Sequence, residues 1–132
     1  MMQPRIDVNR EQIEIVVASF YARIRQHRHL GPIFSNHVRN WPKHEAKIAD
    51  FWASAIRYER TYSGNPMAIH LNANDVEPSH FKIWLEVFDQ TLEQHLGAPQ
   101  KEQWSHLAHR IGRGLCMGVR DFRRPQGDVP RF

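Results

Sequence analysis

The chain lacks several features that define common classes of protein. One cysteine, Cys116, occurs in 132 residues, which excludes an internal disulfide, a cysteine-based zinc site and an iron–sulfur cluster. No apolar run approaches the roughly 18 residues of a membrane span, so no membrane partner is expected. The first residues contain no apolar signal core. Together with the single thiol, this favours a cytoplasmic protein.

Motifs of common catalytic and nucleotide-binding sites are also absent. There is no glycine-rich phosphate loop, no H-E-x-x-H motif and no G-x-S-x-G motif. His106 and His109 could pair as metal ligands on one helix, but no third ligand stands at a diagnostic spacing. A zinc enzyme and a hydrolase with an activated nucleophile are therefore not expected.

The sequence has little of the alternating pattern typical of strands, but it has strong helical periodicity. No stretch alternates apolar and polar residues over six or more positions, whereas apolar residues recur at helical spacing along four segments. We expect one long helix from Asn9 to a stop at Leu30-Gly31-Pro32, one from Asn40, and two over 79–96 and 100–122. The sequence therefore predicts an all-α fold.

The connection between the second and third long helices is the least regular part of the sequence. The turn residues Ser63-Gly64-Asn65-Pro66 precede a short segment, 67–71. A connection of this length without regular structure is uncommon in a compact domain unless it has a function. We expect a single domain over 1–124 with a long central loop, followed by a disordered tail at 125–132.

Four side chains on or near the apolar stripes are candidates for chemistry. His70 lies between aromatic-rich helices, where it could ligate the metal of a flat apolar cofactor; from spacing alone, a surface histidine that caps a turn is the simpler interpretation. His44 lies on an apolar helix face. It is either a core histidine or a second ligand, gate or hydrogen-bond donor. Tyr21 and Trp84 are explained most simply by core packing, although their polar groups could converge on a ligand.

Several short segments are specific when their order and spacing are taken together. They are Phe20-Tyr21, Leu30-Gly31-Pro32-Ile33-Phe34, Trp41-Pro42-Lys43-His44, Ile48 with Phe51-Trp52, Tyr62 through Gly64-Asn65-Pro66-Met67 to His70-Leu71, and Phe81 with Trp84-Leu85. This pattern covers about residues 17–115 and resembles the truncated (two-on-two) haemoglobins, in particular their third group. The resemblance implies a globin-like two-on-two helical sandwich around haem, with a short proximal helix.

The resemblance also implies a role for each matching position. His70 matches the proximal histidine, the protein ligand of the iron of haem b (iron protoporphyrin IX). The distal positions, which contact the bound ligand, match Tyr21, His44, Trp84 and Ile48. The positions that pack on the haem or reach a propionate match Phe34, Lys47, Phe51, Trp52, Tyr62, Met67 and Phe81.

The function implied by the resemblance is reversible binding of dioxygen and other diatomic ligands such as NO and CO. Donors at Tyr21 and Trp84 would suit a scavenger or redox catalyst better than an oxygen carrier, and His44 could act as an acid or base on peroxide. Peroxide or reactive nitrogen and oxygen detoxification is therefore a hypothesis. A peroxidase or NO dioxygenase activity would need an external reductase, because the sequence shows no flavin or nicotinamide site.

The main alternative is a cofactor-free all-α binding module that uses an arginine-rich end to bind nucleic acid. Residues 113–132 contain five arginines and two aspartates, so they carry most of the net charge of +4. The rest of the chain has no comparable excess of basic residues, which argues against a broad nucleic-acid interface. Binding that weakens steeply with salt would favour this alternative.

Overall fold

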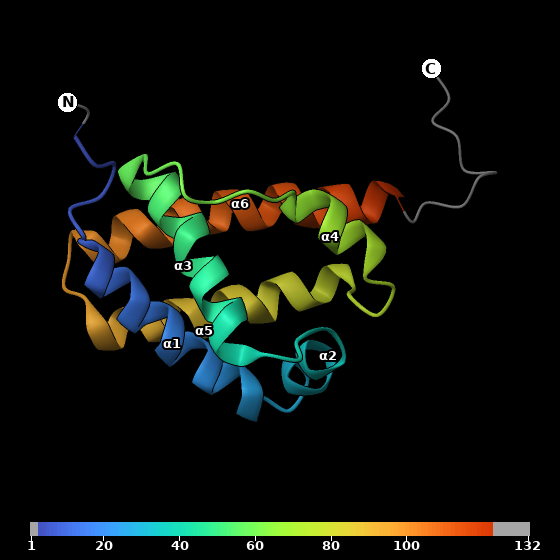
Figure 1. Cartoon of the computed structure of the whole chain (residues 1–132). Helices are drawn as coiled ribbons and strands as arrows, with labels where there is room; N and C mark the ends of the chain where they lie inside the picture. Colours follow the sequence, from blue (N-terminus) through green and yellow to red (C-terminus); the bar gives the residue numbers. More distant parts are fainter. Residues whose placement is uncertain (1–2, 123–132) are drawn as a thin grey trace, which may run out of the picture.

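The computed structural model describes residues 3–122, which form six α-helices and no strand. The helices are α1 (Arg10–Gln26), α2 (Leu30–His37), α3 (Trp41–Arg57), α4 (Pro66–Asn72), α5 (Pro78–His95) and α6 (Gln100–Phe122). Figure 1 shows α5 and α6 as an antiparallel pair, with α1 and α3 packed against each other across it. The predicted all-α fold is confirmed.

Asparagine caps fix where three of the helices begin. The Asn9 side chain accepts the Gln12 N–H at 2.8 Å, and the Gln12 side chain accepts the Asn9 N–H at 2.8 Å, which forms a capping box at α1. Asn40 and Asn65 each cap the next helix through one hydrogen bond of 3.1 Å. A proline follows in the first turn of both helices, where its missing N–H costs nothing.

The corner after α1 differs from the prediction. The helix ends at Gln26, and Leu30-Gly31-Pro32 forms the first turn of α2 instead of stopping α1. His27 Nδ1 accepts two backbone N–H groups at the start of α2, at 3.1 and 3.2 Å. A Cβ at Gly31 would lie 2.8 Å from the carbonyl oxygen of Arg25, so the close approach of α2 to α1 requires glycine. The Gly-Pro pair begins a helix because proline is favoured in a first turn.

The core lies where α1, α3, α5 and α6 meet. The apolar stripe predicted for the first helix is buried throughout: Ile13, Val16, Val17, Phe20, Tyr21 and Ile24. Opposite it, the Trp52 ring stacks on Phe88 at 5.3 Å, and Phe88 meets the Trp104 ring at 5.7 Å. Full burial of one such apolar side chain contributes about 1.5–3 kcal/mol, so these rings fix how the helix pairs cross.

The short helix α4 packs on the second half of α6 (Figure 1). A Cβ at Gly118 would lie 2.4 Å from Met67 Sδ, so the missing side chain at position 118 makes room for α4. The segment predicted at 67–71 is thus a helix, and only its flanks in the 60–78 region are irregular.

Two further expectations concern the ends of the chain and the membrane. No helix within 3–122 has both the length and the hydropathy to cross a membrane. The predicted tail, 125–132, lies outside the described residues, as do three of the five arginines in the arginine-rich end considered for nucleic acid. The domain boundary at residue 124 therefore stays a prediction.

Candidate functional site

A cluster of aromatic and imidazole rings joins α1, α2 and α3. The Tyr21 ring centroid lies 4.9 Å from that of His44, 5.8 Å from that of Phe34 and 5.9 Å from that of Trp41. Three different helices contribute to this cluster. The structure therefore brings together Tyr21, His44 and Phe34, which the sequence analysis assigned to one site.

Trp84 is linked to the same cluster through Phe20, and Ile48 lies one turn after His44 on α3. The Trp84 ring meets the edge of Phe20 at 5.3 Å, and Phe20 lies 5.0 Å from the Tyr21 ring. Trp84 also stacks on Phe88 at 5.3 Å, with an angle of 1° between the ring planes. Both Trp84 and Ile48 pack on the core while staying partly exposed. They leave apolar surface that a ligand or cofactor could cover.

Burial controls the protonation of the two polar groups in the cluster. Tyr21 is 3% exposed. Burial raises the pKa of its hydroxyl well above the ordinary value, and the negative charge of Glu45 raises it further. Burial also lowers the pKa of the His44 imidazole, with Lys47 acting in the same direction. At neutral pH the site therefore contains a protonated phenol and a neutral imidazole.

His44 also has an unsatisfied polar atom. Its Nε2 is buried and has no hydrogen-bond partner within residues 3–122; the one other such side-chain atom in that range is Trp104 Nε1, in the core. A buried polar atom without a partner destabilises a protein by about 1–3 kcal/mol. The Nε2 atom is therefore suited to bond a group that is not part of the chain.

His70 lies on α4, and its ring is oriented by the backbone. Its Nδ1 lies 2.6 Å from the carbonyl oxygen of Pro66, and because a carbonyl can only accept, Nδ1–H is the donor. The Nε2 atom then has a free lone pair. Metal-ligating histidines typically donate their other ring N–H in this way, which fixes the tautomer and the ring orientation. The half-buried ring lies 5.6 Å from that of Phe81.

The residues predicted to pack on haem occupy different environments. Phe51 and Tyr62 meet edge to face at 5.4 Å, and both are partly buried. Phe81 lies beside His70. Trp52 is 2% exposed and belongs to the core. Met67 contacts α6 at Gly118.

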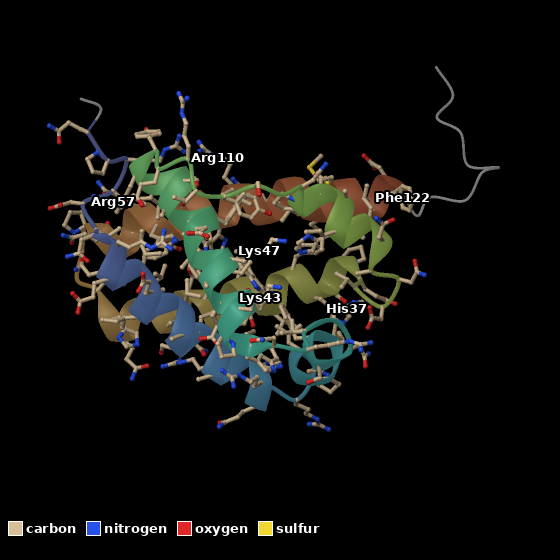
Figure 2. The ribbon with its side chains drawn as sticks, viewed as in Figure 1. His37, Lys43, Lys47, Arg57, Arg110 and Phe122 are labelled. Carbon is tan, nitrogen blue, oxygen red and sulfur yellow. The ribbon has the colours of Figure 1, made fainter. Side chains whose placement is uncertain are left out.

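Lys47, the predicted propionate partner, lies on the exposed side of α3. Figure 2 shows it with Lys43 on the face of α3 turned toward the viewer. Within the described residues Lys47 has no ion-pair partner. Its ammonium group is therefore available to an anionic group that binds beside α3.

Sequence reasoning did not single out Trp41 and Arg25 as site residues. The Arg25 guanidinium lies 4.7 Å from the Trp41 ring centroid, and Trp41 touches both Tyr21 and His44. The available signal was spacing, because Arg25 follows Tyr21 by four residues and Trp41 precedes His44 by three. Residues at those distances share one side of a helix.

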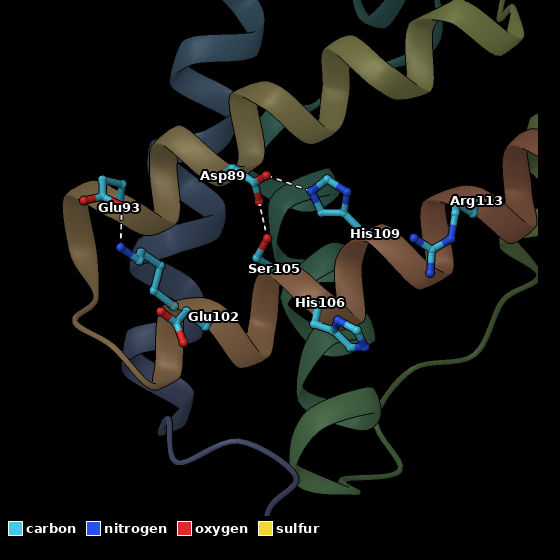
Figure 3. Close-up of a pocket in the computed structure, with 8 residues that line it drawn as sticks. Asp89, Glu93, Glu102, Ser105, His106, His109 and Arg113 are labelled. Atoms are coloured by element: carbon cyan, nitrogen blue, oxygen red, sulfur yellow. Dashed lines mark hydrogen bonds and ion pairs between the residues drawn. The ribbon is translucent and has the colours of Figure 1, made fainter.

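A surface hollow of about 530 Å³ lies away from this cluster, between α5 and α6. Figure 3 shows Asp89 there, accepting from Ser105 Oγ at 2.6 Å and pairing with His109 Nε2 at 2.7 Å. The carboxylate stands between serine and histidine, so the histidine cannot act as base on the hydroxyl. Among residues 3–122 no three potential ligands converge to hold a metal ion.

Comparison with known proteins identifies the class. The family model described as bacterial-like globin matches residues 9–113, and the chain belongs to that family. Within the family it is a group III truncated haemoglobin. It is 36% identical over 89 residues to the protein named "Group 3 truncated hemoglobin ctb" of Campylobacter jejuni, an alignment that covers 64% of this chain and 70% of that relative.

Solved structures agree with this assignment. The crystal structure of a group III truncated hemoglobin from Campylobacter jejuni superposes with a TM-score of 0.82 at 30% identity, covering 85% of this chain and 91% of that one. A group II truncated hemoglobin from Bacillus anthracis gives 0.67 at 19% identity, covering 89% and 92%, and supports the fold alone. The predicted two-on-two globin fold and family are confirmed. Membership in a haemoglobin family implies a haem cofactor, whereas the roles of single residues stay predictions.

Proposed function

We propose that the protein binds haem b between α3, α4 and α5, with His70 as the protein ligand of the iron, and that it binds dioxygen, NO and CO reversibly. The observation that carries this proposal is the His70 ring, whose Nδ1–H is bonded to Pro66 at 2.6 Å and whose Nε2 is free to ligate a metal. When bound, haem supplies an iron centre to which diatomic molecules can attach.

The residues present are suited to such a group on both sides. His70 offers an imidazole on α4 whose ring is held by the Pro66 carbonyl. On the other side, the orphaned Nε2 of His44 needs a partner that the described chain does not supply. Phe34 and Phe51 offer partly buried apolar surface, and the Lys47 ammonium group is free to pair with a propionate.

The distal side chains act on the ligand through hydrogen bonds. The buried Tyr21 hydroxyl stays protonated, so it can donate, and the Trp84 indole N–H is a donor at every pH. Fixed donors in a site with little water stabilise negative charge on a bound molecule more strongly than they would in bulk water. The neutral His44 ring can accept a proton or, in the other tautomer, donate one.

The experiment that tests the proposal is a haemin titration of the purified protein, followed by dithionite and CO. We expect a Soret band that shifts on reduction and again on CO binding. His70→Gly should lose this spectrum, and added imidazole should restore it by filling the ligand position. His106→Ala, on the exposed side of α6, is the matched control and should match wild type. A flat titration of the wild type would reject haem binding, and a normal His70→Gly spectrum would reject the axial role.

We further propose that the protein uses this site in peroxide or reactive nitrogen and oxygen detoxification, with electrons from an external reductase. The contact of Tyr21 with His44, and the link of Trp84 to Tyr21 through Phe20, support this use, because several donors slow ligand release and favour reaction over transport. Steady-state consumption of NO or peroxide with a generic ferredoxin or flavin reductase tests it. Wild-type turnover that falls in Tyr21→Phe and His44→Leu is expected, and wild-type turnover no higher than that of free haemin would reject it.

A further inference from the structure

Three side chains connect the end of α1 to the first two turns of α3 at the edge of the distal cluster. The Arg25 guanidinium lies 4.7 Å from the Trp41 ring centroid, and its Nη2 donates to Glu45 Oε2 at 3.0 Å. One guanidinium thus contacts both an aromatic ring and a carboxylate of the same helix. We call Arg25, Trp41 and Glu45 the latch.

Helical spacing connects the latch to the predicted ligand-binding residues. Arg25 lies one turn after Tyr21 on α1, and Trp41 lies one turn before both His44 and Glu45 on α3, so the latch and the cluster lie next to each other along the two helices. Trp41 belongs to both groups, because its ring lies 5.9 Å from Tyr21 and 6.0 Å from His44. A movement of Trp41 would therefore disturb both rings.

Exposure places the latch on the solvent side of the cluster. The Arg25 and Glu45 side chains are 42% and 18% exposed, while Tyr21 behind them is 3% exposed. Glu45 is close enough to raise the pKa of the Tyr21 hydroxyl, which agrees with its position at the rim. Contacts that are partly exposed are individually weak, so they can break without unfolding the helices.

We infer that the latch closes the distal side of the site and sets the rate at which small ligands enter and leave. This inference rests on the proposed function, because it assigns the latch to the same haem site. Arg25 and Glu45 are positioning residues, since they act through Trp41. When the Arg25 contacts break, Trp41 loses the group that fixes its ring beside Tyr21 and His44, and the cluster becomes open to solvent on that side.

The test compares CO rebinding after flash photolysis in ferrous holoprotein of the wild type and of Arg25→Met, Glu45→Gln and the double variant. Methionine keeps the apolar stem of arginine and removes its charge. Each single change should speed bimolecular CO association about two- to fivefold, the effect expected from the loss of a weak, partly exposed contact. The double variant should equal the singles, because all three break one unit. Arg28→Met is the matched control: Arg28 is exposed just beyond α1, outside the latch.

A second measurement separates opening of the latch from general destabilisation. Hydrogen exchange of the Trp41 indole N–H, followed by NMR in the CO complex, should speed up in Arg25→Met and Glu45→Gln. The indole N–H of Trp104, which is 0% exposed, should keep its wild-type rate, and the thermal midpoints should stay close to wild type.

The possible outcomes separate failure of the latch from failure of haem binding. Faster CO entry with faster Trp41 exchange supports the latch. Wild-type rates in both latch variants overturn it and leave haem binding intact. Equal acceleration of the Trp104 exchange also overturns it, because the change is then global. A wild-type protein that forms no CO complex rejects the proposed function and the latch together.

Discussion

The two sides of the candidate site differ in how deeply their helices are buried in the core. The distal side is built on α1, which buries six residues, and its Tyr21 ring is surrounded by other rings. The proximal side is built on α4, a helix of seven residues with none buried. Residues that would meet one ligand from opposite sides therefore belong to regions with unequal packing.

This difference separates two kinds of constraint. A side chain in the distal cluster both stabilises the fold and faces the site, so a change there alters stability and chemistry together. His70 depends instead on local features: the Asn65 cap, the Pro66 carbonyl and the space at Gly118. Helices with few buried contacts open locally at low free energy, so α4 should be the more mobile side before a cofactor binds.

The largest expected effect is the loss of a core ring on the distal side. Phe20 is 1% exposed and contacts Tyr21, Trp84 and Phe88. Phe20→Ala should lower the free energy of unfolding by about 3–5 kcal/mol, measured by urea denaturation. The proximal control, Ile69→Ala, removes a side chain that is 52% exposed and should change stability by no more than about 0.5 kcal/mol. Similar losses in both variants would contradict the contrast.

The next effect concerns chemistry on the distal side with the packing retained. Tyr21→Phe removes one hydroxyl and keeps the ring contacts, so it should lose a donor worth roughly 1–3 kcal/mol to the bound ligand. By that estimate, dioxygen should dissociate at least about fivefold faster, as measured by stopped-flow displacement with CO. Tyr58→Phe is the control, because that side chain is 38% exposed and lies beside Arg5, outside the candidate site. An unchanged rate in Tyr21→Phe would remove Tyr21 from the ligand-binding set.

Both α3 and α4 begin at an asparagine cap, so the same substitution can be made on each side. Asn40→Ala and Asn65→Ala each remove one asparagine cap with a 3.1 Å bond, a loss of about 1 kcal/mol for the helix concerned. At α3 this loss should appear in global unfolding by urea. At α4 it should appear as faster amide hydrogen exchange within 66–72 and weaker haem affinity, with global stability near wild type. Equal global losses would show that α4 unfolds only with the whole domain.

The sequence predicted the parts of the fold that depend on local signals. Helical periodicity located the four long helices, and Asn9 and Asn40 marked two of their starts. The corner after α1 was placed wrongly, because Gly-Pro is compatible with either the end or the start of a helix. Only the side-chain bonds of His27 and the contact of Gly31 with Arg25 decide between the two.

The identity of the candidate site residues could be predicted from the sequence, but their contacts with one another could not. The resemblance supplied Tyr21, His44, Trp84 and His70, whose spacing alone left core packing as the simpler interpretation. The Pro66 bond to His70 and the orphaned Nε2 of His44 depend on three-dimensional placement. The contact between Arg25 and Trp41 joins residues from two helices, so periodicity within one helix could not reveal it.

The smallest expected effect concerns the contact that joins the two sides. His37, at the end of α2 and labelled in Figure 2, donates from Nε2 to Asp75 at 2.5 Å, and the Asn36 amide donates to the other oxygen at 3.1 Å. Asp75 lies just after α4. The His37 bond is the main cause that lowers the pKa of Asp75, and the Asn36 bond adds to it.

The sign of the pH effect follows from that lowered pKa. The stabilisation from Asp75 is complete above the unfolded pKa of about 3.9 and is lost as pH falls through the lower folded value. Because the two side chains are 45% and 36% exposed, Asp75→Asn should speed haem loss to an excess of apomyoglobin only about two- to fivefold at pH 6. In Asp75→Asn the rate of haem loss should also change less with pH in the acid range than it does in the wild type. Asp7→Asn, at an exposed position before α1, is the control, and wild-type haem loss in Asp75→Asn at every pH would show that the two sides retain haem independently of this contact.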